Sequence, residues 1–137
     1  MRATLRTVIA GTAAVGTLFL TSGSAQAASV WAPPFKSCQN YVAFYIHSYD
    51  QMAGEAAMIC NSTATIMRPQ IAVFYGGRFY VKDKVCTFTT YCQTDRVYVP
   101  RQPGHWYTAT NAGSAGSDFI WPEWAHARVR VHGGYRG

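Results

Sequence analysis

The residues best suited to chemistry in this 137-residue chain are four cysteines, Cys38, Cys60, Cys86 and Cys92. An even number of cysteines in a small domain indicates two disulfides, and three pairings are open. Five residues separate Cys86 from Cys92, a spacing that suits a bridge across a short hairpin and leaves Cys38 to pair with Cys60. Zinc is the competing interpretation, but neither pair has zinc-ligand spacing with a matching pair of histidines.

Histidine and carboxylate side chains form two sets that could act as general acids and bases. Glu123, His126 and Arg128 lie close in the sequence, and His47 with Glu55 makes a second set. Secreted ribonucleases use such residues, so a small hydrolase such as a nuclease is one hypothesis. The chain contains no G-x-S-x-G or H-E-x-x-H motif, and its acidic residues are dispersed. We therefore expect no enzyme activity, no catalytic residue, no metal site and no cofactor.

A row of aromatic side chains between the first two cysteines is the first candidate for binding. The segment Tyr41–Tyr49 alternates as a strand does, with one side apolar. The other side could stack on sugar rings or fill a protein interface, unless a second sheet or loop covers it. The apolar side is Val42, Phe44 and Ile46, and the surface aromatic row is Tyr41, Tyr45, His47 and Tyr49.

The segment before the first cysteine, residues 28–37, is expected to be an extended N-terminal arm. Pro33 and Pro34 exclude it from a central strand, and Trp31 and Phe35 are two large apolar anchors. The functional interpretation is that these four residues bind a groove of a partner protein. The alternative is that the arm folds back on its own domain.

A second aromatic group occurs later in the chain, around the glycine- and serine-rich segment 111–117. Its members are expected on loops, where aromatic residues in this number are typical of binding modules. They are Trp106, Tyr107, Trp121 and Trp124.

The first 27 residues are typical of a secretory signal peptide, which predicts a secreted, extracellular protein. Arg2 and Arg6 precede an apolar run over Val8–Leu20, and Ala25-Gln26-Ala27 is a cleavage site of the A-x-A type. The apolar run is shorter than the roughly 20 residues of a membrane span, so no membrane span is expected.

The charge balance suits an anionic partner without indicating nucleic acid. Without Arg2 and Arg6, ten lysines and arginines face six acidic residues. That mild positive charge is compatible with anionic cell-wall polymers, membranes or acidic proteins, and equally with a charge that serves solubility. No segment clusters its lysines and arginines, so we expect no nucleic-acid partner.

Strand patterns dominate the rest of the chain and predict an all-β fold. Gly76-Gly77 is a hairpin turn signal between two alternating segments. In the second segment Phe79 and Val81 face one way, and Arg78, Tyr80 and Lys82 face the other. Many short strands in about 100 residues favour a small antiparallel β-sandwich with two disulfides over residues 38–137. The expected strands are Gln70–Tyr75, Arg78–Asp83, Arg96–Val99 with Val97 and Val99 inside, and Ala127–His132 with Val129 and Val131 inside. Gln51–Met58 is expected to form one helical turn at most, and Asn111–Ser117 a loop.

The order of these features resembles the secreted bacterial killer-toxin-like and antifungal proteins of the βγ-crystallin type. The resemblance rests on a cysteine, a strand centred on Ile46-His47-Ser48, a second cysteine followed by Asn61, and a last strand at 127–131. It implies a βγ-crystallin-like sandwich and a role in microbial antagonism. The extra Cys86–Cys92 segment and the longer leader depart from the family pattern.

The favoured hypothesis is a non-catalytic adaptor subunit of a secreted toxin complex, such as an umbrella toxin particle. It would dock partner proteins through the arm and the exposed aromatics. The first alternative is a free-standing antifungal protein that binds chitin or another cell-wall glycan through the surface aromatic row.

Overall fold

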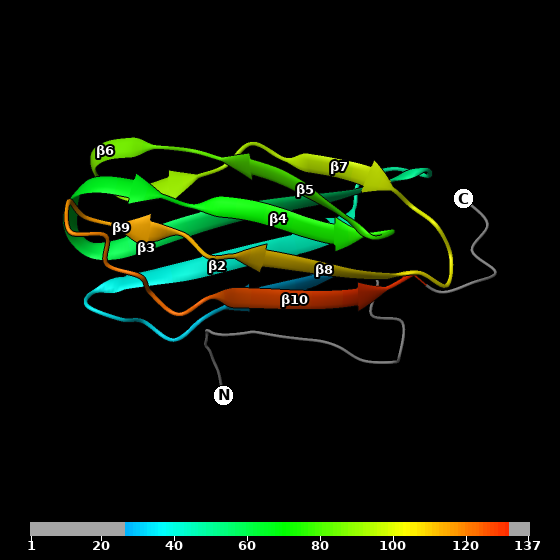
Figure 1. Cartoon of the computed structure of the whole chain (residues 1–137), viewed down its shortest axis with the longest axis horizontal. Helices are drawn as coiled ribbons and strands as arrows, with labels where there is room; N and C mark the ends of the chain where they lie inside the picture. Colours follow the sequence, from blue (N-terminus) through cyan, green and yellow to red (C-terminus); the bar gives the residue numbers. More distant parts are fainter. Residues whose placement is uncertain (1–26, 132–137) are drawn as a thin grey trace, which may run out of the picture.

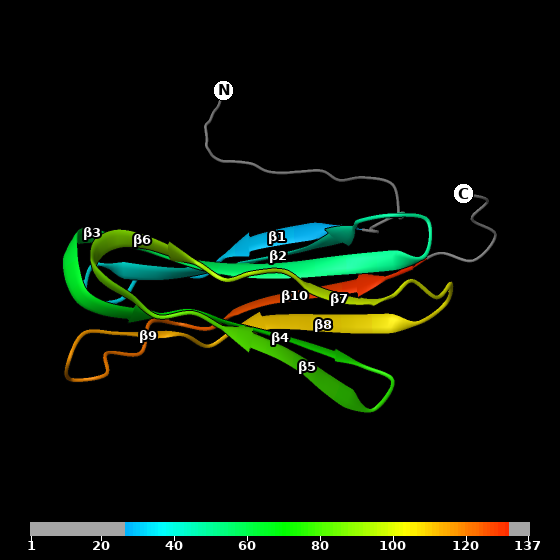
Figure 2. The same ribbon diagram turned by 90° about the horizontal axis from the view of Figure 1, so that it is seen from above.

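The computed structural model describes residues 27–131, which form ten strands in two antiparallel sheets. Figures 1 and 2 show these sheets as the two layers of a sandwich, so the all-β antiparallel prediction is confirmed. No helix in this part of the chain could cross a membrane. The predicted signal peptide lies outside the described residues except for Ala27, and so does His132.

The first sheet contains six strands, built around the long strand β3. Its main order is β1-β2-β3-β6, while β7 and β9 pair with other parts of β3. The bounds are β1 Ala28–Trp31, β2 Cys38–Ile46, β3 Gln51–Arg68, β6 Cys86–Gln93, β7 Val97–Pro100 and β9 Ser114–Ala115.

The second sheet contains four strands in the order β10-β8-β4-β5. As predicted, the turn Gly76-Gly77 joins β4 to β5, and both glycines have the positive φ angles that such a turn requires. The bounds are β4 Gln70–Tyr75, β5 Arg78–Asp83, β8 Trp106–Asn111 and β10 Ala125–Arg130.

The main core lies between the sheets and follows the alternation of the strands. Val42 and Phe44 from β2 meet Ile71 and Val73 from β4, with Tyr107 of β8 beside them. The inward assignments made from the sequence for two later strands are also confirmed: these buried side chains are Val97, Val99, Val129 and Val131.

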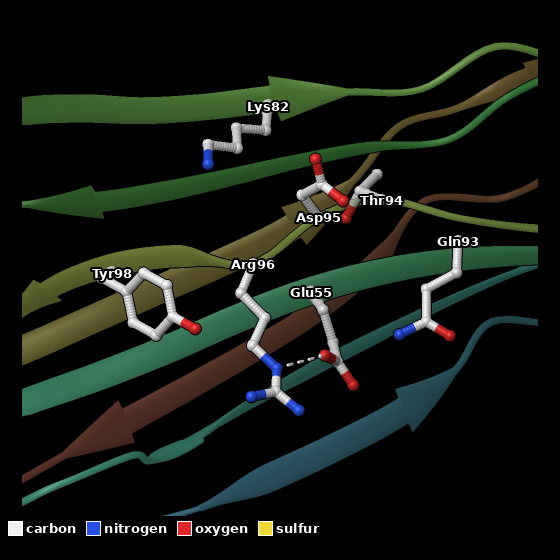
Figure 3. Close-up of a pocket in the computed structure, with 7 residues that line it drawn as sticks. All are labelled: Glu55, Lys82, Gln93, Thr94, Asp95, Arg96 and Tyr98. Atoms are coloured by element: carbon white, nitrogen blue, oxygen red, sulfur yellow. Dashed lines mark hydrogen bonds and ion pairs between the residues drawn. The ribbon is translucent and has the colours of Figure 1, made fainter.

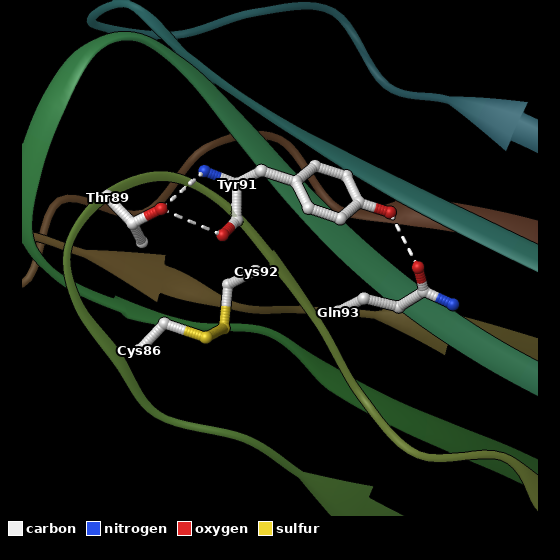
Figure 4. The surroundings of a disulfide bond; sticks show 5 residues. All are labelled: Cys86, Thr89, Tyr91, Cys92 and Gln93. Carbon is white, nitrogen blue, oxygen red and sulfur yellow. Dashed lines mark hydrogen bonds between the residues drawn. A yellow bond between two sulfur atoms is a disulfide. The ribbon is translucent and has the colours of Figure 1, made fainter.

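At one end of the sandwich β3 and β6 curl together around a second, smaller core (Figure 2). Both predicted disulfides are present, Cys38–Cys60 between β2 and β3 and Cys86–Cys92 within β6. The second bridge does not clamp two arms of a hairpin as expected. Instead β6 bends enough to bring its own cysteines to a Cα–Cα distance of 5.8 Å (Figure 4).

A buried asparagine, Asn111 at the end of β8, ties the two sheets together. Its Nδ2 donates to the carbonyl oxygens of Tyr41 at 3.0 Å and Ala57 at 2.8 Å, both in the first sheet. Its Oδ1 accepts from the backbone N–H groups of Gln70 and Gly113. A fully buried amide is tolerated because both donors and both acceptor positions are used.

The N-terminal arm is part of the sandwich, which corrects the predicted division at residue 38. The segment Ala28–Trp31 is the edge strand β1 and pairs antiparallel with β2, from Ala28 opposite Phe44 to Trp31 opposite Tyr41. Ala28 and Val30 pack against the main core, and Ala32 is buried. The two prolines follow this strand, where no ladder hydrogen bond is needed.

Two further expectations for local structure were wrong. The helical turn predicted at Gln51–Met58 is the start of β3, because pairing with β2 overrides the helix propensity of its alanines and methionines. The loop predicted at Asn111–Ser117 contains β9, which pairs with the end of β3. The alternation predicted for β5 is present: Phe79 and Val81 face solvent while Tyr80 packs against the core, because the register sets Phe79 opposite the exposed Phe74.

Candidate functional site

Five aromatic side chains gather on the outer face of the first sheet, and we call this surface the aromatic face. Since Val42 and Phe44 point into the core, the alternate residues of β2 point outward. Strand pairing brings the other members alongside: Trp31 lies opposite Tyr41, and their ring centroids are 4.6 Å apart. The aromatic face consists of Trp31 on β1, Tyr41 and Tyr45 on β2, Tyr91 on β6 and Tyr98 on β7.

Small residues form the floor between these rings. Ala43, Ala53 and Ala57 point outward, yet only 6%, 0% and 2% of their surfaces are exposed. Large neighbours therefore cover them, and a row such as Tyr45–Ala53–Tyr98 alternates ring, methyl and ring across three strands. The rings are supported by a rigid sheet, so little conformational entropy remains to be lost when a ligand binds.

A polar group stands in the middle of the aromatic face. Glu55 accepts hydrogen bonds from the Tyr45 hydroxyl at 3.2 Å and from Nε of Arg96 at 3.2 Å, which also makes it an ion pair. The guanidinium of Arg96 lies 5.8 Å from the centre of the Tyr45 ring. The negative charge of Glu55 is therefore compensated, and its hydrogen-bonding groups remain beside the rings.

Tyr41 and Tyr45 stay uncharged over the whole neutral range. Burial raises the pKa of Tyr41 above its ordinary value, and the nearby charge of Glu55 adds to the increase. Burial, followed by the charge of Glu55, also raises the pKa of Tyr45. A neutral aromatic surface with hydroxyl groups can bind through apolar contact and hydrogen bonds.

A shallow open depression borders the aromatic face where the segment between β6 and β7 passes β5 (Figure 3). One of its residues is structural, since the hydroxyl of Thr94 accepts the backbone N–H of Ala56 at 3.1 Å. The depression widens the polar margin of the surface and is too open to enclose a substrate. Its lining residues are Glu55, Lys82, Gln93, Thr94, Asp95, Arg96 and Tyr98.

Only part of the predicted surface aromatic row lies on one surface. Tyr41 and Tyr45 are half-buried members of the aromatic face, whereas β2 ends at Ile46, before His47 and Tyr49. The ring of His47 packs against Tyr98, with centroids 4.8 Å apart. Tyr49 is exposed in the turn between β2 and β3, so it is not in the row.

The four residues predicted for partner binding by the arm are also separated. Trp31 belongs to the aromatic face and is 48% exposed. Pro33 and Pro34 are exposed in the connection to β2, and Phe35 is exposed at a tight turn closed by backbone hydrogen bonds with Cys38. Trp31 thus shares one surface with Tyr41 and Tyr45 of the predicted row, although the sequence had suggested two separate sites.

The two candidate acid–base sets lie apart: His126 and Arg128 lie together on β10 of the second sheet, whereas Glu55 lies on β3 of the first. Glu55 pairs with Arg96, while His47 contacts Tyr98. His126 contacts Thr110, on the outer face of the other sheet. Among residues 27–131 no group of three or more histidine, cysteine or acidic side chains could hold a metal ion.

Sequence reasoning missed Tyr91 and Tyr98 as members of the aromatic face. Tyr98 alternates with the inward Val97 and Val99, so that alternation was the available signal for an outward ring. The pairing of β7 with β3, which brings Tyr98 near Tyr45, has no local signal in the sequence. In the second aromatic group Tyr107 is fully buried on β8, while Trp106, Trp121 and Trp124 are exposed.

Comparison of the chain with family models, with curated proteins and with solved structures gave no match.

Proposed function

We propose that this protein is a secreted, non-catalytic binding module that docks a partner protein through the aromatic face. The observation that carries the proposal is the convergence of five aromatic rings from four strands on one outer surface. Tryptophan, tyrosine and arginine are the residues that contribute most to protein interfaces, and Trp31, Tyr45 and Arg96 are of these types.

A protein partner explains the exposed apolar surface better than a small ligand does. Fifteen large apolar residues are exposed within residues 27–131, on both outer sheet faces and on loops. A glycan chain covers a single strip, whereas a protein partner can bury exposed apolar residues on more than one surface of a small domain. The protein therefore acts as a subunit, which agrees with the resemblance to secreted toxin assemblies.

Secretion is supported by two independent features. The two disulfides require an oxidising compartment to form and persist. The leader has the pattern of a signal peptide, and β1 begins at Ala28, directly after the predicted cleavage site. The proposed place of action is the extracellular space, in antagonism between microbes.

Binding of a cell-wall glycan is the second candidate, and the polar centre of the aromatic face favours it. Sugars are commonly held by an aromatic ring beneath the sugar and by polar groups at its edge. Here the Trp31–Tyr41 pair supplies the rings, and Glu55, Arg96 and Gln93 supply hydrogen-bonding groups nearby.

The test uses the secreted protein with a tag and two double variants. Trp31→Ala/Tyr98→Ala removes rings at two sides of the aromatic face, and Phe74→Ala/Phe79→Ala removes a similarly exposed pair from the other sheet. Proteins captured from culture supernatant are identified by mass spectrometry, and the captured partner is then purified and titrated with each variant. We expect the face variant to bind at least about 30-fold more weakly, since one hot-spot ring contributes about 2 kcal/mol.

The same variants distinguish binding of a cell-wall glycan from docking of a partner protein. Binding to insoluble chitin or cell walls that is lost only in the face variant would assign the surface to a glycan. A partner that binds both double variants as tightly as the original protein would contradict docking through the aromatic face. Thermal unfolding of each variant shows that the fold is retained.

A further inference from the structure

The outer face of the second sheet carries a separate cluster, which we call the basic strip. The inward residues of β10 and β8 are core residues, so the alternate positions point outward. Pairing of these strands sets Arg130 opposite Trp106 and Arg128 opposite Thr108. The basic strip consists of Trp124, His126, Arg128 and Arg130 along β10 and its entry, with Trp106, Thr108 and Thr110 beside them on β8.

The two guanidinium groups are held in place by Trp106. The Cζ atom of Arg128 lies 4.1 Å from the centre of the exposed indole ring, and that of Arg130 lies 5.8 Å from it. Nε of Arg130 also donates to the carbonyl oxygen of Gly104 at 3.3 Å. Cation–π contacts and this hydrogen bond orient the side chains before any ligand arrives.

Within the described chain neither arginine of the basic strip is paired with a carboxylate, and the acidic residue Glu123 lies at the far end of the strip, before Trp124. Among residues 27–131 no carboxylate forms an ion pair with Arg128 or Arg130, whereas Arg96 on the opposite sheet is paired with Glu55. No acidic residue occupies an outward position on β8 or β10. The two surfaces therefore differ: the charges at the centre of the aromatic face are paired, whereas the basic strip carries two arginines with no carboxylate partner among the described residues.

We propose that the basic strip binds an anionic polysaccharide. Alternate residues on one strand are roughly 6.6 Å apart, so Arg128 and Arg130 present two charges in a line to a linear chain with repeated acidic groups. Guanidinium groups bind carboxylates and related anions through paired hydrogen bonds. Thr108 and Thr110 supply hydroxyl groups for the sugar, and the exposed ring of Trp124 extends the strip toward the entry of β10.

The geometry favours a glycan over single-stranded nucleic acid. Proteins that bind single strands leave aromatic faces free for bases to stack on them. Here Arg128 covers a face of Trp106. Binding of a nucleic-acid backbone depends on many phosphate contacts, and two arginines supply only a few of them.

The test measures binding of the secreted protein to polygalacturonate, with uncharged dextran and a single-stranded oligothymidylate as comparison probes. The variant Arg128→Gln/Arg130→Gln is compared with Arg78→Gln/Lys84→Gln, which removes the same net charge at exposed positions on and beside β5. We expect the strip variant to lose at least about tenfold in affinity, because each guanidinium makes charge-assisted hydrogen bonds. The control variant should retain nearly all of its binding.

A third variant tests the role of the ring. Trp106→Leu keeps both charges and removes the surface that orients them, so it should weaken binding to polygalacturonate by a few-fold at constant net charge. Equal losses in the two charge variants, absent binding to polygalacturonate, or tighter binding to oligothymidylate would each overturn the proposal. Because all substituted side chains are exposed, thermal unfolding should be nearly unchanged in every variant.

Discussion

Replacing Asn111 by alanine should cause one of the largest losses of stability of any polar substitution in this protein. The side chain is fully buried and makes four hydrogen bonds, two to carbonyl oxygens of the first sheet and two from backbone N–H groups. At about 1 kcal/mol for each hydrogen bond, Asn111→Ala should lower the free energy of unfolding by about 4 kcal/mol. That is a large part of the total for a domain of this size, and urea unfolding followed by circular dichroism measures it.

Thr110→Ala is the matched control, since Thr110 is the neighbouring residue of β8 and points outward. Its hydroxyl contacts His126 at the surface, so its loss should change the free energy of unfolding by less than about 0.5 kcal/mol. If Asn111→Ala unfolds within about 1 kcal/mol of the original protein, the buried amide does not hold the sheets together. The account of how Tyr41 is positioned would then be wrong, because Asn111 binds its carbonyl.

Three further outcomes are expected for the fold that supports the aromatic face. Gly54→Val should lower the free energy of unfolding by about 2 kcal/mol, because a Cβ at Gly54 would already lie 3.0 Å from Val73; urea unfolding checks this. Cys86→Ser/Cys92→Ser should cost about 2 kcal/mol by the chain-entropy relation for so short a loop, and hydrogen exchange in β6 should rise without spreading to β8. Burial raises the pKa of Tyr107 in the folded protein. Its contribution to the free energy of unfolding is fully present below the unfolded pKa, near 10, and falls as pH rises through the higher folded pKa, because the unfolded chain loses the phenol proton first. The free energy of unfolding, measured with urea on either side of that pH, should decrease less in Tyr107→Phe than in the original protein. An equal decrease in the variant would contradict this.

Features whose physical cause is local could be predicted from the sequence. Gly76-Gly77 predicts a hairpin because few other residues adopt two successive positive φ angles, and the structure confirms it. The close spacing of Cys86 and Cys92 was sufficient to predict the pairing of all four cysteines. The geometry of that bridge was predicted incorrectly, because the bend of β6 depends on its pairing with the curled β3.

Features that depend on distant partners could not be predicted in the same way. The alanines of Gln51–Met58 have high helix propensity, and only the flanking strands β2 and β7 determine that they form a strand. Alternation along β5 separates Phe79 and Val81 from Tyr80 without indicating which side is buried, and pairing with β4 sets Phe79 and Val81 opposite Phe74 and Ala72 on the outer face. Binary patterning does not decide the buried side of such a strand, because apolar residues also occur on exposed surfaces.

The candidate site was predicted in parts and not as a whole. Alternation along β2 was enough to place Tyr41 and Tyr45 on one outward side. The arm was assigned to a separate site because its prolines suggested separation from the sheet, although β1 ends before them. The joining of Trp31, Tyr91 and Tyr98 to the same face required the order of the strands, which no short segment encodes.

The most direct test of docking through the aromatic face is covalent side-chain footprinting of the protein alone and with its captured partner. Hydroxyl-radical oxidation read by mass spectrometry reports the accessibility of individual tyrosine and tryptophan rings. We predict that Trp31, Tyr91 and Tyr98 become protected in the complex, while Phe79 and Phe88, exposed elsewhere, are oxidised as before. Protection of Phe79 and Phe88 with unchanged oxidation of Trp31 and Tyr98 would contradict the account.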